Sequence, residues 1–149
     1  MKIHYVISAL FFINFSYAQT DDNSLINNAI SQFFEGLNSG DTSLISKVIN
    51  VEAFNLQSFI VIDGKGELQV ELPDEFLETV AKPKKYDFEE RILEQTIHCD
   101  GFIASAWLPY ECYINGKLSH TGVDVIQLAK IDDRWQLISV FDSRIVPKK

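Results

Sequence analysis

The stretch "YINGKLSHTGVDVIQLAKIDDRWQLISVFD", residues 113 to 142, decides the fold of this chain. The dipeptides NG at 115–116 and DD at 132–133 are turn signals, and apolar runs of strand length flank each of them. The stretch therefore predicts antiparallel strands joined by tight turns. A further DG turn at 100–101 extends the prediction to a meander of four strands.

The chain before this meander carries a helical pattern. Apolar residues recur every three or four positions over residues 24–39, which predicts an amphipathic helix, and Asp41 can start a shorter second helix. Residues 53–72 predict a β-hairpin around the turn "DGKG", and residues 73–82 predict a third helix between two prolines. Helices followed by an antiparallel meander indicate an α+β domain, with helices covering one face of a curved sheet.

Residues 1–18 predict a signal peptide. Lys2 precedes the apolar run "YVISALFFINF", and "SYA" before Gln19 is a small-x-small cleavage site. The run is shorter than the roughly 18 apolar residues of a spanning helix, which disfavours a membrane anchor. We expect cleavage after Ala18, export to the periplasm or the cell exterior, and one mature domain over residues 19–149.

Charge and cysteine content narrow the possible partners. The formal net charge is −8 and no basic cluster is present, so neither nucleic acid nor a membrane surface is an expected partner after signal cleavage.

Cys99 follows one strand and Cys112 lies near the far end of the next. Strand geometry separates them by on the order of 30 Å, so we expect two unpaired thiols.

Tight turns also predict which residues share a face of the sheet. A two-residue turn at 115–116 places Trp107 opposite Asp124 and Glu111 opposite His120. The face with both tryptophans is expected to be the interior, and it holds these residues: Ile92, Glu94, Thr96, His98, Ile103, Ser105, Trp107, Glu111, His120, Asp124, Ile126, Leu128, Trp135, Leu137, Ser139 and Phe141.

The opposite face of the predicted sheet is small and apolar. It comprises Ala104, Ala106, Leu108, Tyr110, Cys112, Val123, Val125, Ile138 and Val140. A contiguous patch of this kind usually marks a contact surface, which predicts a homodimer formed sheet to sheet. The alternative is that Asp142, Arg144 and Gln127 break up the patch and leave it in solvent.

Two stretches of the sequence resemble a known superfamily. "FFEGLNSGDTSLISKVI" (33–49) and "AWLPYECYINGKLSHTGVDVIQLAKIDDRWQLISVFDSR" (106–144) are similar to nuclear transport factor 2-like proteins, especially small secreted bacterial members of the SnoaL-like and lumazine-binding-like groups. The resemblance covers nearly all of the predicted mature chain. It implies a cone-shaped fold with three N-terminal helices against a strongly curved, antiparallel-rich sheet, and commonly a dimer. It implies no single function, because the superfamily includes isomerases, cyclases, dehydratases and binding modules.

Asp124 is the candidate with the clearest chemistry. A carboxylate beside Trp107 inside a cone would be desolvated, which raises its pKa and suits a general base. Catalysis, ligand contact and a purely structural buried carboxylate all stay open. His120 lies about 13 Å along the same strand, so we expect it at the rim, paired with Glu111. Glu94 beside Trp107 would bring a second carboxyl near Asp124.

The sequence thus predicts an exported small-molecule-binding domain with a partly apolar pocket inside the cone. Trp107, Asp124 and Trp135 would line the pocket, with Glu94 and His120 as secondary ligand-binding candidates. One alternative is a cofactor-free isomerase or cyclase that uses Asp124 as its base. Another is a non-catalytic dimeric scaffold whose cone is packed shut. No cofactor is expected, and no metal, because the histidines and cysteines lack ligand spacing.

Overall fold

The computed structural model describes residues 15–147, with side chains from residue 21 onward. Helix α1 (Phe15–Ser39) begins earlier than the pattern predicted. Gly40 follows its last residue, and the φ of 75° at Gly40 suits the position after a helix C-terminus. Most of the predicted signal peptide, residues 1–14, lies outside the described part. Among the described residues no helix is long and apolar enough to span a membrane.

Two short helices follow α1 in the chain. Asp41 starts α2 (Thr42–Ser46) as predicted, because its carboxylate accepts a hydrogen bond of 2.9 Å from the backbone N–H of Ser43. Helix α3 (Pro73–Ala81) begins at the predicted proline, where the missing N–H costs nothing. The Glu75 side chain accepts from the backbone N–H of Leu72 at 3.2 Å and completes that helix start.

Seven strands form one sheet. The predicted hairpin is β1 (Asn55–Ile62) and β2 (Lys65–Glu71), and the meander is β3 (Phe88–Ile92), β4 (Thr96–Cys99), β5 (Ile103–Ile114), β6 (Lys117–Ile131) and β7 (Arg134–Ile145). The strand order is β2-β1-β7-β6-β5-β3, with β4 also paired to β5. The sequence predicted one strand before Asp100, and the structure has two there, β3 and β4. The pairing of β1 with β7 is parallel, and all other pairings are antiparallel.

A bulge changes the predicted register of β5 against β6. Tyr113 pairs with Leu118, but Cys112 pairs with His120, so Ser119 is an extra residue on β6. Because side chains alternate along a strand, this single insertion exchanges the two faces of β5 relative to β6. Trp107 consequently pairs with Val125, not with Asp124. The predicted interior position of Trp107 is wrong.

A second bulge affects β7. Leu128 pairs with Leu137, whereas Gln127 pairs with Ser139, so Ile138 is the extra residue. Trp135 and Leu137 are buried before the bulge, and Val140 and Asp142 are buried after it. Phe141 is exposed as a result, although it was predicted to face the interior.

The DG turn at 100–101 is also longer than predicted. Cys99 pairs with Ala104, and the Asp100 carboxylate accepts from the backbone N–H groups of Phe102 and Ile103, both at 2.9 Å. This side-chain closure of the turn is typical of aspartate. The two cysteines are unpaired, as predicted.

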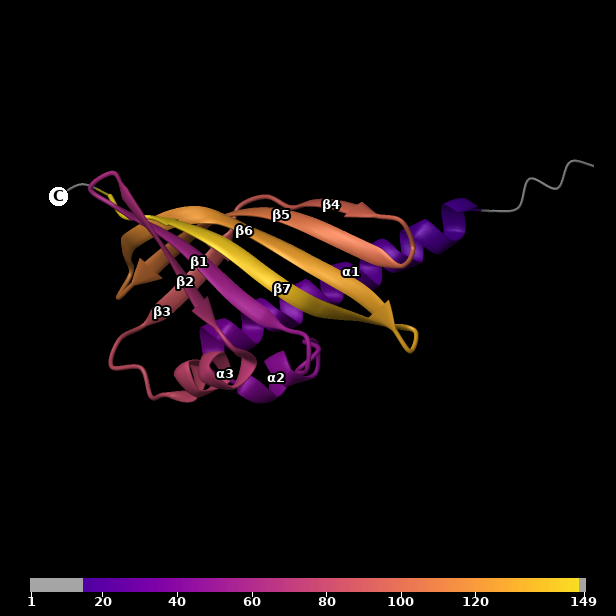
Figure 1. Ribbon diagram of the computed structural model, residues 1–149, viewed down its shortest axis with the longest axis horizontal. Coiled ribbons are helices and arrows are strands. Elements are labelled where there is room, and N and C mark those ends of the chain that lie inside the picture. Colours follow the sequence, from indigo (N-terminus) through magenta and orange to yellow (C-terminus); the bar gives the residue numbers. More distant parts are fainter. Residues whose placement is uncertain (1–14, 148–149) are drawn as a thin grey trace, which may run out of the picture.

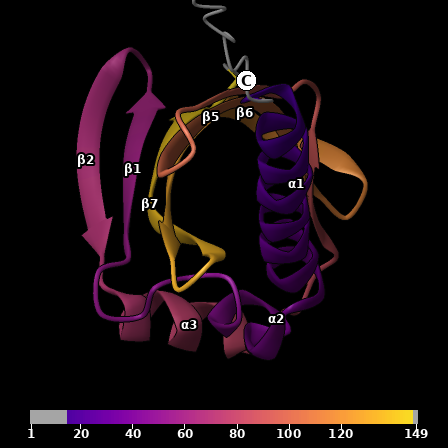
Figure 2. The same cartoon turned by 90° about the vertical axis from the view of Figure 1, so that its right-hand side faces the viewer.

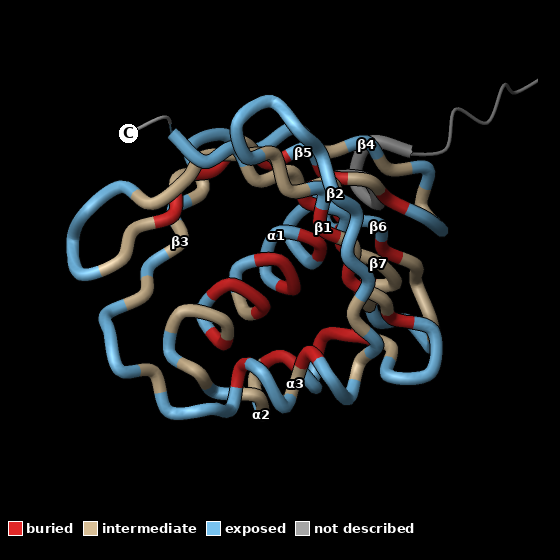
Figure 3. The backbone as a smooth tube through the Cα atoms, turned by 60° about the vertical axis from the view of Figure 1, so that its left-hand side comes forward, coloured by how far each residue is buried: buried red, intermediate tan, exposed pale blue. Residues whose placement is uncertain are grey.

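The sheet is strongly curved, and the helices lie on its concave side (Figure 1). Seen from the side, α1 runs along one flank of the curve while α2 and α3 lie across its base (Figure 2). The buried segments of α1, α3 and the strands face this interior (Figure 3). The structure thus has the cone-shaped α+β architecture expected from the sequence.

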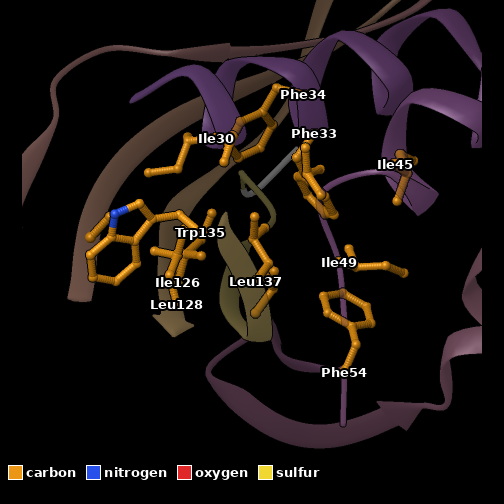
Figure 4. Close-up of a cluster of buried hydrophobic side chains, with 14 of the residues drawn as sticks. Ile30, Phe33, Phe34, Ile45, Ile49, Phe54, Ile126, Leu128, Trp135 and Leu137 are labelled. Carbon is orange, nitrogen blue, oxygen red and sulfur yellow. The ribbon is translucent and has the colours of Figure 1, made fainter. Parts of the chain in front are cut away.

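The buried core fills one end of the cone. It packs α1 residues Ile30 and Phe33 against Ile126, Trp135 and other residues of β6 and β7 (Figure 4). Phe33 stacks on Phe76 of α3 with ring centroids 5.9 Å apart, which ties the two helices together. Polar residues lie toward the other end of the cone.

Candidate functional site

A cavity of about 590 Å³ lies between α1, α3 and the concave face of the sheet. The helices contribute apolar residues to its wall, and the segment joining α3 to β3 lies at its edge. The sheet contributes ionisable residues. The lining comprises Phe33, Phe34, Leu37, Leu56, Glu71, Phe76, Thr79, Val80, Lys82, Pro83, Lys84, Lys85, Tyr86, Phe88, Glu90, His120, Asp124, Val140, Asp142 and Arg144.

Asp124 lies in a row of inward-facing residues that crosses the sheet. Its neighbours are Leu108 on β5 and Asp142 on β7, and Ser58 on β1 continues the row beyond Asp142. Asp124 is only 3% exposed, and its Oδ2 atom is buried without a hydrogen-bond partner within the described residues. The predicted inward orientation of Asp124 is confirmed.

Asp142 is the charged neighbour of Asp124 across β6 and β7. Its Oδ2 atom accepts from Nε of Arg144 at 2.6 Å, and Arg144 also donates to Oγ of Ser58 at 2.9 Å. Its Oδ1 atom, like Oδ2 of Asp124, is buried without a partner in the described part of the chain. Two adjacent carboxyls therefore each present one unused acceptor.

Tyr110 holds the next row of the site in place. Its hydroxyl donates to the backbone oxygen of Ser143 at 3.1 Å and lies 3.4 Å from Oδ2 of Asp142. Gly122 lies between Tyr110 and Arg144 in this row. A Cβ atom at Gly122 would lie 1.7 Å from the Ser143 oxygen and 2.8 Å from the tyrosine ring, so only glycine allows this close approach.

His120 and Glu90 form the row nearest the end of the sheet. Cys112 lies between them, paired with Glu90 on β3 and with His120 on β6. The His120 ring packs edge-on against Tyr110 with centroids 5.8 Å apart. Asn38 of α1 fixes the Glu90 backbone through two hydrogen bonds, of 3.0 and 2.8 Å.

Burial dominates the electrostatics of this site. It raises the pKa of Asp124 well above the ordinary value of 3.8, and the carboxyls of Glu90 and Asp142 raise it further while Arg144 opposes them. Burial, with a contribution from Asp142, raises the pKa of Glu90 to about 7. Burial lowers the pKa of His120, so its imidazole is neutral at pH 7.

The described residues include no group of three or more His, Cys, Asp or Glu side chains arranged to hold a metal ion. Asp124 and Asp142 share one row while Glu90 lies in the row of His120, and Arg144 occupies an oxygen of Asp142. What the arrangement can do chemically is accept hydrogen bonds or exchange a proton with a molecule in the cavity.

Three of the five predicted site residues lie elsewhere. Trp107 is 53% exposed on the outer face of the sheet, and Glu94 is exposed in the segment between β3 and β4. Trp135 is buried in the apolar core (Figure 4). Its indole N–H donates to Asp22 at 3.0 Å. None of the three lines the cavity, because the Ser119 bulge reverses the face of β5 and the core fills the cone around Trp135.

His120 lies inside the cavity wall and not in a rim ion pair with Glu111. Glu111 is on the other face of the sheet, where it accepts from the Tyr113 hydroxyl at 2.7 Å. The predicted pairing is wrong for the same reason, since the bulge places His120 opposite Cys112.

Four important site residues were not predicted. A register without bulges places Tyr110, Asp142 and Arg144 on the outer face of the sheet, and Glu90 is absent from the predicted site. The sequence does hold a signal for Glu90, since it alternates with Phe88 and Ile92 on one side of a strand.

Solved structures with the same fold were found, although neither a family model nor a curated protein sequence matches the chain. A nuclear transport factor 2-like protein of unknown function from Shewanella baltica OS155 is 18% identical, with a TM-score of 0.66 over 91% of this chain and 100% of that one. A protein so described from Pseudomonas putida KT2440 is 15% identical, with a TM-score of 0.65 over 83% of this chain and 87% of its own.

An enzyme is also among the similar structures. Hexachlorocyclohexane dehydrochlorinase (LinA) type 2 is 10% identical, with a TM-score of 0.65 over 86% of this chain and 88% of its own. The chain has the nuclear transport factor 2-like fold, as the sequence resemblance implied. Proteins of this fold include ligand-binding and elimination-type members, so the fold does not decide between binding and catalysis.

Proposed function

We propose that the chain binds a small, partly apolar molecule in the cavity of the cone. The cavity has the composition of a ligand site. Phe33, Phe34 and Phe76 form its aromatic walls. The sheet forms its polar floor, which comprises Glu90, His120, Asp124, Asp142 and Arg144. A volume of about 590 Å³ favours this function over a scaffold whose cone is packed shut.

The observation that carries the proposal is the unpaired Oδ2 atom of Asp124. A buried acceptor without a partner costs about 1–3 kcal/mol of folding free energy. Such a cost is tolerated where the group serves a ligand, because binding supplies the missing donor. Asp124 lines the cavity, so its carboxyl group borders the space that a ligand would occupy.

The proposal is tested by a thermal-melt screen of the protein against heterocycles, steroids and polyketide-like aromatics. A ligand at about 100 times its dissociation constant adds roughly 2.7 kcal/mol, and we expect the resulting upward shift in Tm to be reduced in Asp124→Asn. Glu94→Gln is the matched control, because it changes an exposed carboxylate outside the cavity. A shift that is equal in Asp124→Asn and the wild type would refute the role of Asp124 in binding.

A second candidate function is proton transfer by Asp124. A buried carboxyl with a raised pKa is a stronger base once it is ionised, and Asp124 faces a cavity near a neutral His120. This arrangement would suit an isomerase, a cyclase or an elimination such as the dehydrochlorination named for one structural neighbour. Turnover that rises with pH and disappears in Asp124→Asn would support it, whereas a ligand recovered unchanged would support binding alone.

Two further proposals concern the whole protein. Residues 1–18 would direct export and be removed after Ala18. The mass of the protein recovered from the periplasm or the medium tests this, since retention of the leader would contradict it.

The outer face of the sheet would form a homodimer through a row of Trp107, Val125 and Phe141 across β5, β6 and β7. This row replaces the apolar set expected from the sequence, whose β5 members are buried inside the cone.

A further inference from the structure

Two buried carboxyl oxygens without a hydrogen-bond partner among the described residues lie on neighbouring strands of the cavity wall. Oδ2 of Asp124 and Oδ1 of Asp142 belong to cross-strand partners, and both residues line the cavity. Asp124 is 3% exposed and Asp142 is 5% exposed, so bulk solvent does not satisfy them. A ligand seated against this floor would satisfy both oxygens by supplying hydrogen-bond donors.

Several of the protein's nearby donors are already engaged with other acceptors. Nε of Arg144 donates to Oδ2 of Asp142, and its Nη2 donates to Ser58. The Tyr110 hydroxyl is directed to the Ser143 carbonyl and to Asp142, while Nδ1 of His120 is engaged with the Ser119 hydroxyl. A ligand hydroxyl has one hydrogen to donate, whereas a primary ammonium has three.

The charges of the floor favour a cation as well. On the concave face of the sheet three carboxyls, those of Glu90, Asp124 and Asp142, accompany one guanidinium, that of Arg144. The lysines of the cavity, Lys82, Lys84 and Lys85, lie in the segment after α3, and Glu71 on β2 adds a fourth carboxyl to the lining. The aromatic and aliphatic residues of α1 and α3 face the sheet across the cavity. An added positive charge would let more of the carboxyls ionise together, because opposite charges lower the free energy of the ionised forms.

We propose that the cavity binds a primary amine, whose ammonium group lies between Asp124 and Asp142 and whose apolar body lies against Phe33, Phe34 and Phe76. This inference rests on the proposed binding function and names the chemical class of its ligand. The walls tolerate different apolar bodies, so recognition comes from the ammonium group.

The direction in which the affinity for an amine changes with pH follows from the ionisable and charged groups around the cavity floor. These are Glu71 on β2, Glu90 on β3, Tyr110 and Cys112 on β5, His120 and Asp124 on β6, Asp142 and Arg144 on β7, and Lys82, Lys84, Lys85 and Tyr86 beyond α3. Burial raises the pKa of Glu90 to about 7 and raises the pKa of Asp124 above its ordinary value, and a bound ammonium would lower both. Amine binding should therefore release protons and become tighter as the pH rises past the Glu90 pKa of about 7. A neutral ligand that accepts a hydrogen bond from protonated Asp124 would show the opposite trend.

Isothermal titration calorimetry with tryptamine and tryptophol tests the proposal. The two molecules share an indole body and differ only in the ammonium or hydroxyl group. We expect tryptamine to bind about 10- to 100-fold more tightly at pH 8, as charge-assisted hydrogen bonds imply. Titrations in two buffers of different protonation enthalpy should show net proton release, and Asp124→Asn should remove the preference while Glu94→Gln retains it.

The results separate the amine proposal from the binding function. Equal or tighter binding of tryptophol, proton uptake, or weaker tryptamine binding at higher pH would overturn the amine proposal and leave a ligand pocket standing. Absence of tryptamine binding would also overturn it, while a neutral hit in the thermal-melt panel would still support the pocket. The comparison of tryptamine with tryptophol on the wild-type protein, and the pH dependence of tryptamine binding, test the amine proposal even if Asp124→Asn fails to fold.

Discussion

Asp124 on β6 and Asp142 on β7 are direct cross-strand partners, buried side by side on the concave face of the sheet. Arg144 forms an ion pair with Asp142, and the described residues offer Oδ2 of Asp124 no donor. A fold selected only for stability would place apolar residues at both positions, as it does at Ile126 and Val140 in the adjacent row. The pair therefore indicates a cavity kept for a polar task.

Asp124→Asn should raise the stability of the protein at neutral pH. The pKa of Asp124 is raised in the folded state, so its contribution to stability is fully present below the unfolded value of 3.8 and is lost as the pH rises through the folded value. Asparagine has no charge to bury, and we expect a gain of about 1–3 kcal/mol. Urea unfolding between about pH 4 and 8 should show the gain growing with pH. A loss of stability at all pH values would show that the carboxylate anchors the fold.

Asp22→Asn should have the opposite effect. The Asp22 carboxylate accepts from Nζ of Lys130 at 2.8 Å and from the Trp135 indole at 3.0 Å, which fixes α1 to β6 and β7. The hydrogen bond from Lys130 is the largest cause of the lowered pKa of Asp22. We expect a loss of about 1–2 kcal/mol.

The pH profile checks the origin of that loss. Because the folded pKa of Asp22 is lowered, its contribution is present above the unfolded value of 3.8 and disappears as the pH falls through the folded value. The difference between wild type and Asp22→Asn in urea unfolding should therefore vanish in acid. Asp21→Asn, at an exposed neighbouring position, should show no such difference at any pH.

Gly122→Ala should be strongly destabilising. The new methyl group would lie 1.7 Å from the Ser143 carbonyl oxygen, which is backbone and cannot move away by a change of rotamer. We expect a loss of about 2 kcal/mol or more in urea unfolding. Thr121→Ala at the adjacent position of β6 is the control and should cost less. A mild effect of Gly122→Ala would mean that β6 and β7 can separate easily at this point.

Trp107→Glu should convert the proposed dimer to a monomer. The substitution places a charge in the middle of the outer row with Val125 and Phe141, and a buried unpaired charge strongly opposes association. Sedimentation equilibrium measures the mass of each variant. Lys65→Glu on β2, which is exposed and outside this row, should remain dimeric. A wild-type protein that is monomeric at high concentration would refute the dimer directly.

The two thiols should react at very different rates. Cys112 is buried, and burial raises its pKa to about 11, so little thiolate forms at neutral pH. Cys99 is half-buried beside the turn and should react first with a thiol-specific chromogen. Cys99→Ser should remove the early phase and Cys112→Ser should leave it unchanged. Equal rates would indicate that β3, β5 and β6 open together around Cys112.

Local chemistry explains which parts of the fold could be predicted from the sequence. The turns at 115–116 and 132–133 rest on residues that adopt positive φ, here 52° at Asn115 and 49° at Asp132. The helices follow from apolar spacing and from Asp41 and Pro73, whose effects are confined to their own first turn. The inward orientation of Asp124 follows from its alternation with Ile126 and Leu128 on one strand.

The composition of the site, in contrast, was decided by the tertiary structure. The extra residues Ser119 and Ile138 have no marked sequence signal, yet each reverses the facing of the strand segment beyond it. Through them Tyr110, Asp142 and Arg144 enter the cone and Trp107 and Phe141 leave it. A strand has a side-chain period of two, so one insertion exchanges its faces, and only packing of the whole sheet against α1 and α3 determines where such an insertion is stable.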